Sequence, residues 1–114
     1  MPLVPYNNRT MAVNRMEALR SMLEQDPANS FARYGLAQEY ANSGELTLAV
    51  EEYAALIGHD PGYCAAYYHG GQALQRLGRT GEARDYYQRG IEAAVRKGDA
   101  HTQSELKEAL DTLL

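Results

Sequence analysis

Cysteine is almost absent from this sequence of 114 residues, because Cys64 is the single one. A chain with one cysteine cannot form an internal disulfide. It therefore lacks the covalent framework on which many small secreted domains depend. This absence favours a protein of the reducing cytoplasm.

Long apolar runs and clusters of basic residues are missing as well. The longest apolar segments, such as 53–57 and 64–68, are far shorter than the roughly 18 residues that indicate a membrane-spanning helix. Lysine and arginine are interleaved with acidic residues, and the net charge is −4. Neither nucleic acid nor a membrane is therefore expected as a partner. Residues 1–9 contain prolines and no apolar core, which predicts a flexible tail rather than a signal peptide.

Residues that could carry catalysis or hold a metal are few and poorly spaced. His59, His69 and His101 have no second histidine three or four residues away, the spacing that places two metal ligands on one helix face. Cys64 with His69 suggests a thiol nucleophile and its base, but their spacing turns the two side chains roughly 140° apart on a helix. A structural cysteine is the simpler interpretation. We predict no catalysis, no metal and no cofactor.

The sequence does contain an internal repeat with a period of 34 residues. The pair Asp26-Pro27 returns as Asp60-Pro61, and shifting residues 30–63 onto 64–97 aligns several identical residues. Most of these are small, aromatic or glycine residues, the types that determine helix contacts and helix ends. The identical pairs are Ala32 and Ala66, Tyr34 and Tyr68, Gln38 and Gln72, Gly44 and Gly78, Ala49 and Ala83, Tyr53 and Tyr87, and Ile57 and Ile91.

Each period is expected to hold two helices, because its apolar residues recur at helical spacing. Ser30 is the expected N-cap of the first helix, and Gly44 supplies the left-handed residue that ends it. The second helix is expected over 45–57, ending before Gly58 and Asp60-Pro61. No strand is expected. The remaining helices are predicted at 10–25, 63–77, 80–96 and 99–114.

Both copies carry small and large residues at fixed offsets. In the first copy these are Leu36, Ala37, Tyr40, Gly44, Ala49, Tyr53 and Pro61, and in the second Tyr67, Gly71, Leu74, Gly78, Ala83 and Tyr87. The pattern resembles the tetratricopeptide repeat and extends over nearly all of the chain from Thr10 onward. The resemblance implies an all-α fold, a right-handed superhelix of antiparallel helix pairs with about six helices. The single domain, 10–114, would comprise a half repeat (10–29), two repeats (30–63 and 64–97) and a capping helix (98–114). The pattern departs from the family at Arg33, Gly70 and Val95.

The resemblance also implies a binding surface, because the first helices of successive repeats line the concave face of such a superhelix. It places on that face Phe31, Tyr34, Gln38 and Ala41 from the first copy, and Ala65, Tyr68, Gln72, Gln75 and Arg76 from the second. Tyrosine offers contact area and glutamine offers both donors and an acceptor, so a peptide is the expected ligand. Alternatively, Tyr34 and Tyr68 pack only against neighbouring helices. Arg76 is the one basic residue in the set, which disfavours the acidic chaperone tails that some members of the family bind.

Two functional hypotheses follow. In the first, the protein is an interaction module, an adaptor or scaffold that holds a peptide or helix of a partner protein in its concave groove. In the second, it is a self-associating structural unit, a homodimer formed through the first helix. The apolar residues of that helix spread over more than one face, and methionine-rich surfaces adapt readily to a second helix. They are Met11, Val13, Met16, Leu19, Met22 and Leu23.

Overall fold

The computed structural model describes residues 8–113, and these form helices joined by short turns. The helices are α1 (Asn8–Gln25), α2 (Ser30–Asn42), α3 (Leu46–His59), α4 (Cys64–Arg76), α5 (Thr80–Lys97) and α6 (Ala100–Asp111). The prediction of an all-α fold with about six helices is confirmed for this part of the chain. Helix α1 begins at Asn8, two residues before the predicted start at Thr10. The rest of the predicted tail, residues 1–7, lies outside the described residues.

The turns inside the two repeats are built alike. Gly44 and Gly78 have φ angles of 85° and 78°, the left-handed conformation in which glycine carries no steric penalty. One residue later the backbone N–H of Glu45 donates to the carbonyl of Tyr40 at 2.9 Å. The N–H of Arg79 donates to the carbonyl of Leu74 in the same way, also at 2.9 Å. These bonds satisfy carbonyls at the helix ends, so the predicted role of Gly44 is confirmed, and Gly78 has the same role in the second copy.

Several predicted helix boundaries differ from the structure, including the end of α6, which stops at Asp111, and two of the differences have a clear local cause. The N-cap of α2 is Asn29, whose Oδ1 accepts a hydrogen bond from the N–H of Ala32 at 3.0 Å. Ser30 is instead the first residue of the helix, and its hydroxyl donates to Asp60 at 3.2 Å. Helix α3 also continues through Gly58 to His59, because Gly58 does not adopt the left-handed conformation that would end a helix.

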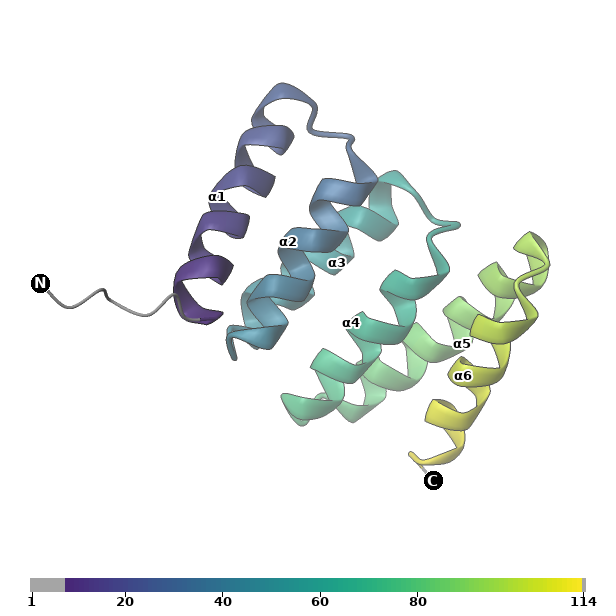
Figure 1. The fold of residues 1–114 in the computed structure, drawn as a ribbon. Coiled ribbons are helices and arrows are strands. Elements are labelled where there is room, and N and C mark those ends of the chain that lie inside the picture. Colours follow the sequence, from purple (N-terminus) through teal and green to yellow (C-terminus); the bar gives the residue numbers. More distant parts are fainter. Residues whose placement is uncertain (1–7, 114) are drawn as a thin grey trace, which may run out of the picture.

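Figure 1 shows the helices as two layers of an elongated molecule, with α1 and α6 at opposite ends. Helices α2, α4 and α6 lie side by side in one layer, where α4 contacts both of the others, and α3 and α5 lie behind them. Each connected pair of helices packs together, and α1 contacts α2 alone among the described helices. The extents are 55 × 31 × 23 Å. The layer of α2, α4 and α6 is the one that the resemblance predicts to be concave, and it is called here the concave face.

The main core lies between the two layers, and a smaller cluster joins α1 to α2. Tyr53, Tyr87 and Leu74 are fully buried in the main core. The smaller cluster contains Leu19, Ala32 and Leu36, with Met16, Leu23 and Tyr40 partly buried against them. Because burial of apolar area is the chief driving force for folding, the repeats from α2 to α6 hold most of the stability.

Glycine lets the aromatic core residues fit between closely packed helices. A Cβ atom placed on Gly71 of α4 would lie 2.3 Å from Cε1 of the Tyr87 ring on α5. A Cβ on Gly90 of α5 would lie 2.9 Å from Cδ2 of Leu106, a fully buried residue of α6. Such distances are far inside van der Waals contact, so both positions require a residue without a side chain. The close contact at Gly90 also docks α6 onto the second repeat.

Candidate functional site

The concave face contains two hollows that meet on α4. The first, of about 510 Å³, lies between α2 and α4, and the second, of about 370 Å³, between α4 and α6. Gln72 and Gln75 line both, so the two hollows form one continuous surface, called here the groove. The first hollow is lined by Gln38, Ala41, Asn42, Tyr53, His69, Gln72, Ala73, Gln75 and Arg76. The second is lined by Tyr68, Gln72, Gln75, Tyr87, Glu105, Glu108, Ala109 and Thr112.

Buried tyrosines orient two of the groove glutamines. The hydroxyl of Tyr53 donates to Oε1 of Gln38, and the hydroxyl of Tyr87 donates to Oε1 of Gln75 at 2.7 Å. Burial raises the pKa of both phenols, that of Tyr87 to about 12, so each keeps its proton at neutral pH and acts as the donor. With the carbonyl side of each amide engaged in this way, the Nε2 groups are the donors left for a ligand.

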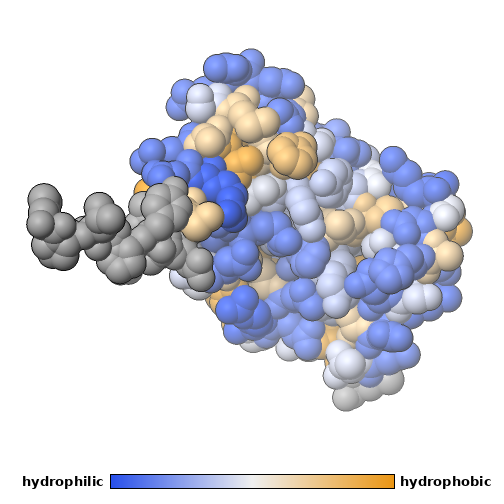
Figure 2. Space-filling model, viewed as in Figure 1, coloured by the Kyte–Doolittle hydropathy of each residue, from blue (hydrophilic) through white to orange (hydrophobic). Residues whose placement is uncertain are grey.

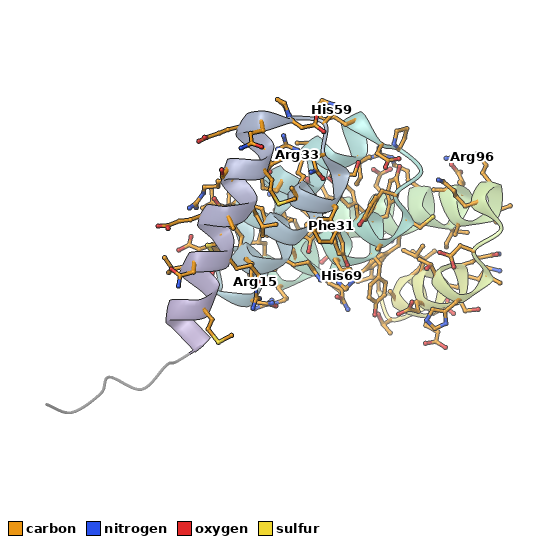
Figure 3. The ribbon with its side chains drawn as sticks, turned by 45° about the horizontal axis from the view of Figure 1, so that its top comes forward. Arg15, Phe31, Arg33, His59, His69 and Arg96 are labelled. Atoms are coloured by element: carbon orange, nitrogen blue, oxygen red, sulfur yellow. The ribbon has the colours of Figure 1, made fainter. Side chains whose placement is uncertain are left out.

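An aromatic cluster centred on His69 lies beside the glutamines. The imidazole ring is 5.9 Å from the ring of Tyr34 on α2 and 5.1 Å from that of Tyr68, its neighbour on α4. Figure 3 shows His69 on the concave side of the fold. Burial lowers the pKa of His69, although a hydrogen bond with Gln72 and the charge of Glu105 act in the opposite direction. The imidazole is therefore mainly neutral at pH 7 and adds little positive charge to the groove.

Some of the predicted binding residues line the groove and others do not. Gln38, Gln72, Gln75 and Arg76 line the first hollow, and Tyr68 lines the second.

Tyr34 and Phe31 are placed differently. Tyr34 packs against the rings of Tyr53 and Tyr63, at 6.3 and 5.1 Å, and lines neither hollow. Phe31 is 69% exposed and also lies outside both hollows. Tyr34 therefore packs among neighbouring rings and forms no wall of either hollow.

The sequence analysis missed His69, Glu105 and Glu108 as groove residues. His69 was considered only as a metal ligand or catalytic base, although it directly follows Tyr68 on the same helix. Glu105 and Glu108 lie in the segment 98–114, which was predicted only to be a capping helix. Their spacing of three residues, which places both on one helix face, was the available signal.

The charge of the groove changes from one hollow to the other. Arg76 is the basic residue of the first hollow, whereas the second contains the carboxylates of Glu105 and Glu108. Glu105 lies 3.2 Å from Nε2 of His101, which balances its charge only when the imidazole is protonated. Glu108 has no ion-pair partner within residues 8–113. The second hollow is therefore acidic.

A second surface lies beside α1, in a hollow of about 880 Å³. Arg15 reaches from α1 to the carboxylate of Glu39, which is only 6% exposed (Figure 3). Arg20 donates to the hydroxyl of Tyr40 at 2.8 Å, and its guanidinium lies 5.6 Å from the centre of that ring. The hollow is lined by Met11, Val13, Arg15, Met16, Arg20, Glu39, Tyr40, Asn42, Ser43, Glu45 and Leu48.

Residues 8–113 contain neither clustered metal ligands nor a membrane-spanning helix. No three His, Cys, Asp or Glu side chains within this range are grouped so that they could hold a metal ion. None of the helices described is both long and apolar enough to cross a membrane. Figure 2 shows polar residues over most of the face formed by α2, α4 and α6, with small separate apolar patches.

Comparison with known proteins identifies the family. The sequence pattern of the tetratricopeptide repeat matches residues 65–94, which comprise nearly all of α4 and most of α5. A TPR repeat-containing protein of Pseudomonas aeruginosa is 30% identical over 91 residues, which cover 80% of this chain and 87% of that protein. The crystal structure of a tetratricopeptide repeat domain protein from Salinibacter ruber is 38% identical, with a TM-score of 0.71, and the match covers 75% of this chain and 94% of that one.

A more distant structure shares the fold over a longer stretch. The first TPR of Spaghetti (RPAP3), bound to the HSP90 peptide SRMEEVD, has a TM-score of 0.79 at 18% identity. That match covers 92% of this chain and 79% of the other. The identity to the Pseudomonas protein, over most of both chains, agrees with the helix pairs, the glycine turns and the buried tyrosines described above. This chain belongs to the tetratricopeptide repeat family.

Proposed function

We propose that the protein is an interaction module that holds a peptide segment of a partner protein in the groove and catalyses no reaction. The observation that carries this proposal is the pair of tyrosine–glutamine hydrogen bonds. They fix Gln38 and Gln75 with their amide donors available to a ligand before it arrives. A peptide backbone presents a row of carbonyl acceptors, and donors fixed in advance bind them at a lower entropic cost.

Three further features support the proposal. The groove is open and crosses three helices, a shape that suits an extended or helical segment better than a compact small molecule. Tyr68, which lines the second hollow, provides aromatic area for the ligand. A relative of the same fold, the first TPR of Spaghetti, holds a peptide. With two full repeats the groove is short, so a modest affinity is expected.

Peptide selection tests the proposal directly. A phage-displayed library of peptides about 12 residues long would be selected on the folded protein, and the enriched peptides measured by fluorescence anisotropy. We expect Tyr68→Ala to weaken them by roughly 1–2 kcal/mol and Gln72→Ala to weaken them as well. Gln88→Ala is the matched control, because Gln88 is exposed on α5 and lines neither hollow. Enriched peptides that bound all three variants as well as the parent would contradict groove binding.

The α1 surface favours a second candidate, self-association. Met11 and Val13 are 40% and 50% exposed next to the large hollow, and α1 has α2 as its only neighbour among the described helices. A second copy of α1 would bury these side chains. Gel filtration with light scattering distinguishes the candidates. A dimer that Val13→Asp converts to a monomer would support self-association, and a monomeric parent across micromolar concentrations would exclude it.

A further inference from the structure

We propose that the groove selects a basic peptide, with a lysine or arginine of the ligand lying in the second hollow against Glu105 and Glu108. The inference rests on the proposed function and adds to it the chemical class of the partner segment. It would make the partner of this protein opposite in charge to the acidic HSP90 peptide held by the first TPR of Spaghetti.

The shape and lining of the second hollow provide the first argument. It holds about 370 Å³ between α4 and α6, room for a long side chain. Its accessible walls combine the ring of Tyr68 with two carboxylates, whereas Tyr87 is fully buried beneath it. A lysine or arginine side chain suits this lining, because its methylene stem packs on aromatic surface while its charged end reaches the carboxylates.

The availability of the carboxylates provides the second argument. Glu108 has no ion-pair partner among residues 8–113, and the ion-pair partner of Glu105 there is His101, whose charge depends on protonation. Lys107, which lies between them in sequence, does not line the hollow. A cation of the ligand would therefore complete this part of the groove instead of displacing a partner already there.

The first hollow gives the third argument, since it would bind an acidic peptide poorly. Arg76 is its basic residue, and His69 is mainly neutral because burial lowers the pKa of the imidazole. One guanidinium would have to balance several ligand carboxylates while Glu105 and Glu108 repelled them from the adjoining hollow. The net charge of −4 acts in the same direction at longer range.

The two hollows would contact different chemical groups of the ligand. The fixed amides of Gln38 and Gln75 would take main-chain carbonyls, which carry no sequence information. The acidic second hollow would then bind one basic side chain and so determine the sequence preference. Because the carboxylates are partly exposed, the selectivity should be modest and should decrease with salt.

The test begins from the peptide selection described above. We expect the enriched peptides to contain lysine or arginine well above its frequency in the library. One of them would be synthesised in three capped forms that carry its basic residue, glutamine or glutamate at that position. At low salt the basic form should bind about 5- to 10-fold more tightly than the glutamine form, and the glutamate form most weakly. Adding about 0.5 M salt should remove most of that difference.

Two double variants show whether the preference is local. Glu105→Gln with Glu108→Gln should bring the ratio of the affinities for the basic and glutamine forms to about 1. Glu51→Gln with Glu92→Gln is the matched control, because both residues are exposed and line neither hollow. It changes the net charge by the same amount and should keep the preference.

Each other result has a definite meaning. Peptides that bind through Tyr68 without any charge preference would overturn this inference and leave the proposed function intact. A preference that both double variants reduced equally would show general charge attraction and would also overturn it. Failure of every peptide to bind would count against the proposed function and the inference together.

Discussion

The close contact between Gly71 and Tyr87 allows a sharp test of the repeat packing. Gly71→Ala adds one methyl group whose carbon would lie 2.3 Å from Cε1 of Tyr87 and 2.9 Å from its Cζ. Gly58→Ala is the matched control, since Gly58 is also helical and a Cβ there meets nothing within 4 Å. Both substitutions gain the helix propensity of alanine, and only the first collides with a neighbour.

The expected cost follows from the surroundings of the ring. Carbon atoms pack at about 3.5 Å, so the ring or helix α5 has to move by about 1 Å. Tyr87 is fully buried, and its hydroxyl holds Gln75 at 2.7 Å. Overpacking costs about 1–3 kcal/mol and a weakened hydrogen bond about 0.5–1.5 kcal/mol, against a gain of about 1 kcal/mol in helix propensity. We therefore expect Gly71→Ala to lower the free energy of unfolding by about 1–3 kcal/mol.

Urea denaturation followed by far-ultraviolet circular dichroism would measure this difference. Gly71→Ala should lower the urea midpoint with an unchanged slope, and each kcal/mol should lower the Tm by about 4 °C. Gly58→Ala should be neutral or stabilising by up to about 1 kcal/mol. If Gly71→Ala were as stable as Gly58→Ala, the register of α4 against α5 described here would be incorrect.

Three further predictions concern a helix cap, the last helix and pH. Asn29→Ala should cost about 1 kcal/mol of unfolding free energy, because it removes the N-cap of α2, and Ser30→Ala should cost less. Equal losses for the two variants in urea denaturation would count against Asn29 as the cap. Leu106→Ala should cost about 2–5 kcal/mol, because it empties a fully buried site between α6 and α5, and a thermal scan that showed no loss would mean that α6 is not docked. The pKa of His69 is lowered in the folded state, so the unfolded chain binds a proton at His69 more readily. The free energy of unfolding should therefore fall as the pH drops from about 7.5 through 6.5 toward the pKa of His69 in the folded state. His69→Gln should flatten that dependence, and an identical pH profile for parent and variant would refute it.

Most of the fold was predictable from the sequence, because it depends on local rules and on a repeat. Helical spacing of apolar residues indicated the helices, and Gly44 and Gly78 indicated two of the turns, where only glycine avoids a steric penalty. The period of 34 residues then placed the helices in pairs. Helix ends were less certain, since Asn29 and Ser30 are both good N-caps and the sequence does not rank them.

The groove was only partly predictable. Gln72, Gln75 and Tyr68 followed from the resemblance and line the hollows, whereas Tyr34 packs inside the aromatic cluster. The sequence also did not indicate that the carboxylate of Glu108 would face the groove, because nothing in α6 shows which neighbour its polar face meets.

The sequence by itself determined the helices, their order and their pairing, since these depend on residues close along the chain. The tertiary structure decided which polar groups meet. Tyr53 and Gln38 lie 15 residues apart on different helices, and Tyr87 and Gln75 lie 12 apart. Periodicity assigns a side chain to a face of its own helix. It contains no information on the group opposite, because that depends on how two helices cross and how far apart their axes lie.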